Sequence, residues 1–233
     1  MKISELKRLA TLGQLAAGVA HEINNPLGGI VVYSHLLLED TSLDDPRRPN
    51  IEKIVREADR CRIIVKGLLD FTRQNSPELK STDVITIIKE ALNNICREPE
   101  FDNITIIEKF ENGIPYVMVD ASQIQEVFEN IIRNAAEVMK GSGELIISSR
   151  LFSKNGHKMV EILFEDTGPG IPLESIDHVF DPFFTTKGGG HGTGLGLTVS
   201  YGIVDRHGGT ITIRNRDEGG AVFSVQLPVG EEE

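Results

Sequence analysis

The chain contains no tryptophan, only two cysteines among its 233 residues, and no apolar run that approaches the length of a membrane span. A transmembrane helix needs about 20 consecutive apolar residues, so none is predicted, and no segment has the pattern of a signal peptide. Cys61 and Cys96 form no metal or redox motif. We expect them to be small buried or half-buried residues in a reducing compartment, with this part of the protein in the cytoplasm.

Basic residues are in deficit, with 24 Lys and Arg against 35 Asp and Glu and a net charge of −11. Nucleic-acid partners favour a basic face, so we expect no nucleic acid here. The length allows two modest domains, each with a core. Met1 leads directly into sequence that is typical of the middle of a helix. We therefore expect a preceding region, such as a sensor, and expect membrane attachment only through that region.

Apolar residues at spacings of three, four or seven predict two helices on either side of a polar turn at residues 40–49. The first stripe consists of Leu12, Ala16, Val19, Ile23, Leu27, Ile30 and Leu37, and the second of Ile51, Ile54, Ala58, Cys61, Val65 and Leu68. Two such helices form an antiparallel hairpin. Because one hairpin cannot cover its own apolar faces, we predict a homodimer in which two hairpins make a four-helix bundle.

A polar segment at residues 73–83 contains Pro77 and is predicted to be a linker, which divides the chain into domains at 1–76 and 77–233. Beyond it the pattern becomes mixed. Strands are predicted at 104–110, 145–151, 160–165, 210–214 and 222–227, and helices at 84–96, 122–139 and 195–206. The predicted class is therefore α+β: a helical hairpin followed by an α/β sandwich with helices on one face of a mixed sheet.

His21 lies in the first predicted helix, on the side opposite its apolar stripe, with Asn25 close to the same outer face. Glu22 can accept a hydrogen bond from one ring nitrogen and so raise the basicity of the other. A zinc-protease motif is excluded because the fourth residue after His21 is Asn25 and not a second histidine. A lone exposed histidine more often has no function, so on this evidence His21 is undecided.

The C-terminal half contains polar residues suited to a nucleotide and its metal. Asn130 and Asn134 lie four residues apart on one helix face, and the amide oxygen of Asn134 suits Mg²⁺. Asp166 follows an apolar strand and precedes Gly168 and Gly170, which permit close backbone approach. Its carboxylate can accept hydrogen bonds from an exocyclic amine such as that of adenine.

Two further patterns follow along the chain. Aromatic residues at 180–184 precede Lys187, which can place a point charge near a terminal phosphate. The dense glycines that follow include Gly192, Gly194 and Gly196, whose backbone N–H groups can cradle phosphates where a helix begins. Each pattern alone is more often an ordinary helix face, turn or flexible loop. A P-loop is excluded because the chain has no Gly-Lys pair.

The order of these patterns is more specific than any one of them. The motifs are His21-Glu22-Ile-Asn-Asn25-Pro26, Asn130–Asn134, Asp166–Gly170, Phe180–Lys187 and Gly192–Gly196. Over essentially its full length the chain resembles the cytoplasmic core of two-component sensor histidine kinases, in which these segments are the H, N, G1, F and G2 boxes. The resemblance implies a dimerisation and phosphoacceptor hairpin followed by an ATP-binding domain of the Bergerat (GHKL) type.

The resemblance also implies roles for individual residues. ATP would phosphorylate His21, which Glu22 orients and activates, and the phosphoryl group would pass to an aspartate on a response regulator receiver domain. Asn25 matches the residue that positions water to dephosphorylate the regulator, Asn134 the residue that holds Mg²⁺, and Asp166 the residue that binds adenine. The remaining nucleotide-binding positions are Asn130, Gly168, Gly170, Lys187, Gly192, Gly194 and Gly196.

Two alternatives stay open, and one departure from the family pattern is visible. The chain could be an ATP-driven conformational machine of the same superfamily, against which the outward His21 argues. It could also be a non-catalytic dimeric scaffold, which has no need of every box. Ala221 stands where relatives often carry Thr or Ser, which predicts a weaker water-mediated contact with adenine. Whether transfer runs within one subunit or across the dimer is open.

Overall fold

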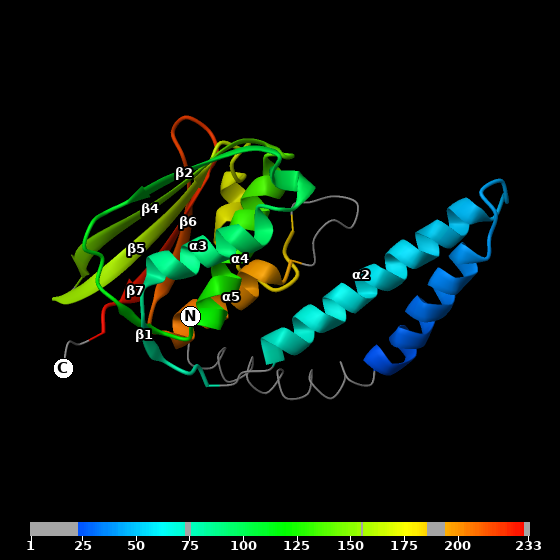
Figure 1. The fold of residues 1–233 in the computed structure, drawn as a ribbon, viewed down its shortest axis with the longest axis horizontal. Coiled ribbons are helices and arrows are strands. Elements are labelled where there is room, and N and C mark those ends of the chain that lie inside the picture. Colours follow the sequence, from blue (N-terminus) through cyan, green and yellow to red (C-terminus); the bar gives the residue numbers. More distant parts are fainter. Residues whose placement is uncertain (1–22, 73–75, 155, 186–193, 231–233) are drawn as a thin grey trace. The chain divides into compact units, whose positions relative to one another are not determined.

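The computed structural model describes residues 23–72, 76–154, 156–185 and 194–230 (Figure 1). The chain divides into two compact units. The first comprises Met1–Asn75 and Pro182–Gly196, and the second comprises Ser76–Asp181 and Leu197–Glu233. Helices alone form the hairpin in the first unit, and a sheet with helices forms the second, so the predicted α+β class is confirmed.

The first unit contains a helical hairpin, made by a helix over residues 23–39 and by α2 (Arg48–Thr72). The Arg48 side chain donates hydrogen bonds to the carbonyl oxygens of Leu38 and Thr41, where the first helix ends and its carbonyls lack helical partners. The predicted turn is slightly too long, because α2 already begins at Arg48. Pro49 is accommodated in the first helical turn, where its missing N–H is not needed.

The hairpin buries part of each predicted stripe and leaves the rest exposed. Its core cluster is Leu27, Val31, Ala58 and Val65. Of the predicted first stripe, Leu27 is buried, whereas Ile23, Ile30 and Leu37 are 43%, 52% and 51% exposed. On α2, the predicted Ile51, Ala58 and Val65 are buried together with Val55, while Ile54 and Cys61 are exposed. Each helix carries two apolar faces, and periodicity alone does not tell which one packs within the hairpin.

The second unit is built on a five-stranded mixed sheet with the strand order β2-β4-β5-β7-β6. Its strands are β2 (Asn103–Phe110), β4 (Ser142–Lys154), β5 (His157–Asp166), β6 (Thr210–Asn215) and β7 (Ala221–Pro228). β2 and β4 run parallel, and the other neighbours are antiparallel. The helices α3 (Val84–Ile95), α4 (Ala121–Val138) and α5 (Gly196–Arg206) cover one face of the sheet, as predicted (Figure 1).

A second, two-stranded sheet was not predicted. β1 (Lys80–Thr82) pairs antiparallel with β3 (Val117–Val119). β1 lies inside the segment expected to be a linker, and its polar sequence carries no strand pattern, so backbone pairing with a distant segment creates it. Two short 3₁₀ turns, η1 (Pro99–Phe101) and η2 (Leu173–His178), complete the unit.

Two helices of the second unit, α3 and α4, begin at aspartate caps. Asp83 accepts a hydrogen bond from the N–H of Ile85, and Asp120 caps α4 in the same way. The buried side chain of His207 joins α5 to α4: Nδ1 donates to the carbonyl of Ile203 (2.8 Å), and Nε2 accepts from the N–H of Asp120 (3.0 Å). These two hydrogen bonds fix the start of α4, the helix that carries the predicted asparagine pair.

The two cysteines are both exposed, so the expectation of burial is wrong. Their small size permits burial but does not require it. Although the Cys96 side chain reaches solvent, neighbouring protein partly desolvates its thiol, and this desolvation together with the charges of Glu108 and Glu98 raises the pKa of the thiol. Within the described residues, no helix is long and apolar enough to span a bilayer.

Candidate nucleotide-binding site

Asp166, the last residue of β5, is a buried carboxylate with only 2% of its surface exposed. Its Oδ1 accepts hydrogen bonds from the N–H groups of Gly168 (2.8 Å) and Ala221 (3.2 Å). Burial raises the pKa of Asp166, although these two N–H groups and the charge of Arg216 act in the opposite direction. The backbone thus orients one carboxylate oxygen, and Oδ2 is the acceptor that remains for a ligand.

At two positions in the loop after Asp166, the structure has room only for glycine. A Cβ atom on Gly168 would lie 2.9 Å from Oδ1 of Asp166 and 3.1 Å from a methyl group of Val138. Gly170 has φ +76°, and a Cβ there would lie 3.0 Å from Oδ1 of Asn215. Both glycines therefore serve close packing of the loop, which explains the glycine pattern in the sequence.

The predicted asparagine pair lies on α4, the helix whose C-terminal end packs against the loop after Asp166. Asn130 and Asn134 are both half-buried and lie on one face of α4. The end of α4 packs against the loop after β5: Thr167 Oγ1 contacts the sulfur of Met139 at 3.6 Å and accepts a hydrogen bond from the N–H of Glu144. The structure therefore places the C-terminal end of α4 beside the Asp166 loop.

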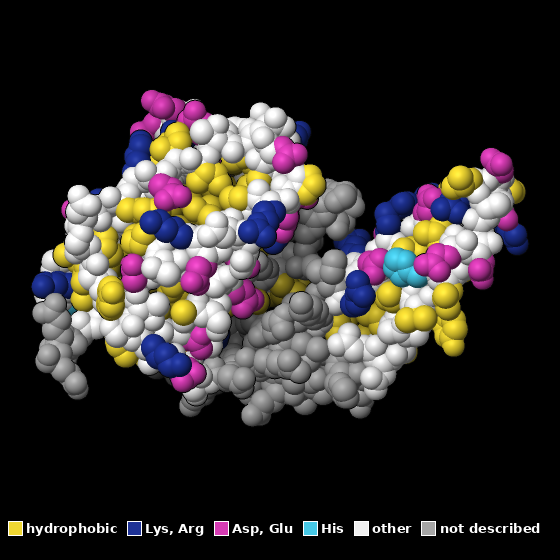
Figure 2. Space-filling model, viewed as in Figure 1, with side chains coloured by type: hydrophobic (Ala, Val, Ile, Leu, Met, Phe, Trp, Pro, Cys, Tyr) yellow, Lys and Arg dark blue, Asp and Glu magenta, His cyan; other side chains and the backbone are white. Residues whose placement is uncertain are grey.

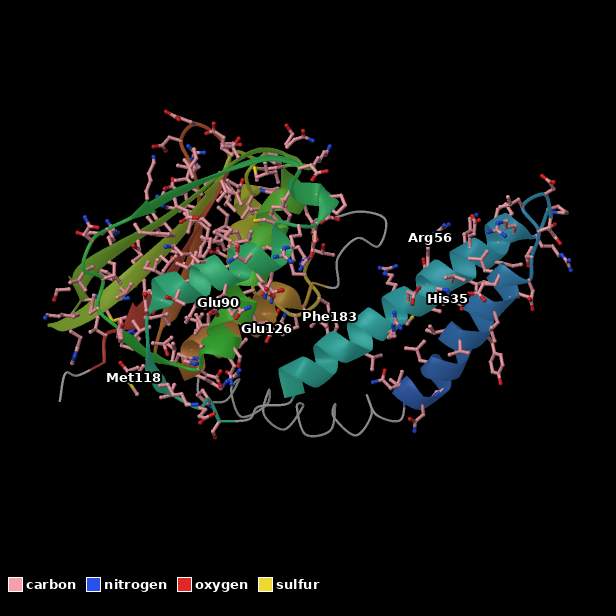
Figure 3. All side chains as sticks on the ribbon, viewed as in Figure 1. His35, Arg56, Glu90, Met118, Glu126 and Phe183 are labelled. Carbon is pink, nitrogen blue, oxygen red and sulfur yellow. The ribbon has the colours of Figure 1, made fainter. Side chains whose placement is uncertain are left out.

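The aromatic and glycine-rich segments are built around a strained turn. The N–H of Phe183 donates to the carbonyl of Gly194 at 3.0 Å. Phe183 has φ +66°, which is uncommon for a bulky residue, and its side chain is 55% exposed (Figure 3). Gly194 has φ +67°, and a Cβ would come within 2.4 Å of the Phe183 carbonyl carbon. Gly196 is the first residue of α5.

The structure describes only part of the predicted site. His21, Glu22, Lys187 and Gly192 lie outside the described residues. Asn25 is exposed on the first helix, on the outer side as predicted. Among the described residues, the structure brings together Asp166 and the glycines at 168 and 170, with the C-terminal end of α4 packed against them.

Two residues next to this loop carry no signal in the sequence. Asn215, which ends β6, and Arg216 both hydrogen-bond the segment from Asp166 to Ile171. An Asn-Arg pair at the end of a strand is an ordinary turn sequence. Only the pairing of β6 with β7 places it beside a loop more than 40 residues away, so spacing along the chain could not have found it.

The two parts of the chain match two family models. Residues 119–231 match the model described as "Histidine kinase-, DNA gyrase B-, and HSP90-like ATPase". Residues 11–77 match the model described as "His Kinase A (phospho-acceptor) domain". The fold and the site thus define an ATPase domain of the histidine kinase, gyrase and HSP90 type, preceded by a phosphoacceptor hairpin.

Individual relatives agree with this class. The sensor histidine kinase ZraS of Escherichia coli K12 is 32% identical over 228 residues, which is 97% of this chain and 48% of ZraS. The catalytic domain of the histidine kinase ThkA is 31% identical with a TM-score of 0.55, and the match covers 65% of this chain and 97% of that domain. Full-length ShkA, crystallised with AMPPNP, shares the fold at 21% identity and a TM-score of 0.73, over 94% of this chain and 47% of ShkA.

The chain belongs to the sensor histidine kinases. It spans about half the length of ZraS.

Proposed function

We propose that this chain is the kinase core of a two-component sensor kinase, which binds ATP with Mg²⁺ and transfers the γ-phosphoryl group to His21. The observation that carries the proposal is the buried, backbone-oriented carboxylate of Asp166 in a domain that matches an ATPase model. A phosphoacceptor model that includes position 21 supports the transfer. Residues 1–76 would form the dimerisation and phosphotransfer domain, and residues 77–233 the catalytic domain.

Adenine recognition follows from the chemistry of Asp166. Oδ1 is held by the N–H groups of Gly168 and Ala221, so Oδ2 is directed to accept a hydrogen bond from the 6-amino group of adenine. Ala221 offers no hydroxyl beside this carboxylate. The recognition therefore depends on the carboxylate and on the backbone, and not on a side-chain hydroxyl at position 221.

The polar face of α4 fits Mg²⁺. This ion prefers oxygen ligands and keeps several waters, so it is bound through one or two protein oxygens together with substrate phosphates. The amide oxygen of Asn134, on the helix whose end packs against the Asp166 loop, would supply one such ligand. Bound Mg²⁺ would neutralise charge on the phosphates. Lys187 and the glycines at 192, 194 and 196 are assigned to the phosphates as well.

The transfer itself is a substitution at phosphorus. A neutral imidazole nitrogen of His21 attacks the γ-phosphorus, the new N–P bond forms, the bond to the β,γ-bridging oxygen breaks, and ADP leaves. Glu22 accepts a hydrogen bond from the other ring nitrogen and stabilises the positive charge that develops on the ring. The phosphoryl group then passes to an aspartate of a response regulator. ThkA, 28% identical with a TM-score of 0.65 over 96% of this chain and 64% of that one, was crystallised with the response regulator TrrA.

A homodimer through the hairpin is the assembly that we propose. Ile30, Tyr33 and Leu37 of the first helix and Ile54 of α2 are all about half exposed or more. They line a groove of about 460 Å³ on the hairpin, where apolar side chains gather (Figure 2). An apolar face of this kind on a two-helix unit is typical of a bundle completed by a second copy.

Incubation with γ-labelled ATP and Mg²⁺ tests the kinase proposal. Wild-type protein is expected to acquire label that is acid-labile and alkali-stable, and His21→Gln is expected to acquire none. Equal labelling of both proteins would contradict the assignment. Tight ATP binding without any label would instead favour an ATPase or a scaffold.

A phosphatase activity towards the regulator is assigned to Asn25, which is exposed four residues after His21. Asn25→Ala is expected to autophosphorylate at the wild-type rate, because it leaves the nucleotide site intact. It is expected to dephosphorylate the phosphorylated regulator at least about tenfold more slowly, since one positioning hydrogen bond is lost. Loss of both activities together would refute this division of roles.

A further inference from the structure

Asn215 binds the end of the Asp166 loop in the way a neighbouring strand would. Its Oδ1 accepts a hydrogen bond from the N–H of Ile171 at 2.8 Å, and its Nδ2 donates to the carbonyl of the same residue at 2.7 Å. One side-chain amide thus satisfies both backbone groups of a loop residue 44 positions away in sequence. The loop is tethered at this end by a matched donor and acceptor.

Arg216 holds the other end of the loop. Its Nη1 donates to the backbone carbonyl of Asp166 at 3.1 Å. The guanidinium is only 18% exposed and lies 3.8 Å from a carboxylate oxygen of Glu165 and 3.9 Å from one of Glu218. Two consecutive residues therefore fix the first and last residues of the segment from Asp166 to Ile171.

The turn between β6 and β7 is shaped for this contact. The N–H of Arg216 donates to the carbonyl of Gly220 at 3.0 Å, which closes the turn. Gly220 has φ +94°, and a Cβ there would lie 1.9 Å from the carbonyl oxygen of Asp166. Any side chain at this position would push the turn away from the loop. The backbones of the two segments are thus in direct contact, and the absence of a side chain at Gly170 leaves room for the Asn215 amide.

We propose that Asn215 and Arg216 are positioning residues that set the base specificity of the nucleotide site by fixing the loop that orients Asp166. The inference rests on the proposed binding of ATP through this carboxylate. Adenine presents an amine to it, whereas guanine presents a carbonyl at the same ring position. A fixed carboxylate rejects guanine because two acceptors face each other. A carboxylate free to turn loses the Gly168 hydrogen bond, and with it part of this discrimination.

Asn215→Asp tests the two hydrogen bonds between Asn215 and Ile171 with almost no change in the shape of the side chain. The carboxylate can still accept from the N–H of Ile171, but it has lost the donor and sets an oxygen against the Ile171 carbonyl. Affinity for ATP is expected to fall about tenfold, as for one lost buried hydrogen bond, with a smaller loss for GTP. Asn93→Asp, at an exposed position on α3, makes the same charge change and serves as control. Competition with a fluorescent nucleotide measures both affinities.

Arg216→Gln tests the other end of the loop, and Arg214→Gln is its matched control, because Arg214 is exposed on β6 two residues earlier. Arg216→Gln is expected to lower the ratio of ATP to GTP affinity, Arg214→Gln to leave it unchanged, and Arg216→Lys, which keeps one donor, to restore part of it. Thermal unfolding of each variant reports the folded fraction.

The outcomes separate this inference from the proposed function. If the wild type fails to bind ATP, the proposed function is wrong. If the wild type binds ATP and the Asn215 and Arg216 variants keep its ATP-to-GTP ratio, the positioning role is overturned. Equal losses for both nucleotides, in step with a lower folded fraction, would also overturn it, because they indicate a purely structural contribution.

Discussion

At the scale of one residue, the buried carboxylate of Asp166 serves ligand binding but lowers the stability of the folded domain. Burial raises its pKa above the ordinary value of 3.8. In the interval between that value and the raised one, the folded state binds more protons than the unfolded state. The free energy of unfolding therefore decreases as pH rises through this interval, and the ionised carboxylate destabilises the empty domain at neutral pH. A ligand amine that binds the ionised form recovers part of this loss.

Asp166→Asn should therefore stabilise the empty domain while it abolishes ATP binding. An amide oxygen can still accept from Gly168 and Ala221, and the buried charge is gone. We expect the free energy of unfolding at pH 7 to rise by about 1 kcal/mol, and the gain to vanish below pH of about 3.9, where the carboxyl is protonated. Denaturant titrations at both pH values measure it, with the exposed Asp177→Asn as control. A less stable variant at pH 7 would contradict the account.

Asn134→Asp tests the proposed magnesium ligand. The added charge alters the coordination of Mg²⁺ and repels the phosphates, so phosphoryl transfer is expected to slow about 10- to 100-fold. The measurement is the rate of autophosphorylation as a function of Mg²⁺ concentration, with Asn93→Asp as the control for charge. An unchanged rate and an unchanged Mg²⁺ dependence would show that Asn134 does not bind the metal.

At the scale of single elements, the sequence predicts long periodic segments well and contacts between distant segments poorly. The five strands of the main sheet and the helices α3, α4 and α5 lie where the patterns place them, with ends that differ by a few residues. β1 escapes prediction because only its pairing with β3 makes it a strand. Asp166, Gly168 and Gly170 are evident from their motif, whereas Asn215 acts through a register that no local pattern contains.

The hairpin gives an element-scale test of the proposed dimer. Ile30→Asp puts a charge in the apolar groove and is expected to shift the protein from dimer to monomer, because burial of an unpaired charge at an interface is costly. Leu43→Asp is the control, since Leu43 is 83% exposed in the turn. Sedimentation at several protein concentrations distinguishes the states. A dimer equally stable in both variants would place the interface elsewhere.

At the scale of the whole molecule, residues 73–79 connect the phosphoacceptor hairpin to the ATPase-type domain. Phosphoryl transfer requires the nucleotide to reach His21, so the two units must approach each other during the reaction. Such a motion is a property of the assembled protein and of neither unit alone. Experiments on the separated units are therefore not a sufficient test of the proposed phosphorylation of His21.

The most direct test is to locate the phosphoryl group after incubation of the intact chain with ATP and Mg²⁺, by mass spectrometry of peptides prepared without acid. The account predicts phosphorylation at His21 in the wild type and none in Asp166→Asn, in which the nucleotide no longer binds. His35 is an internal reference, because it is a histidine on the described part of the hairpin, 48% exposed at its side chain and 3.1 Å from Asp59. A phosphoryl group on His35, or on His21 in Asp166→Asn as fully as in the wild type, would contradict the account.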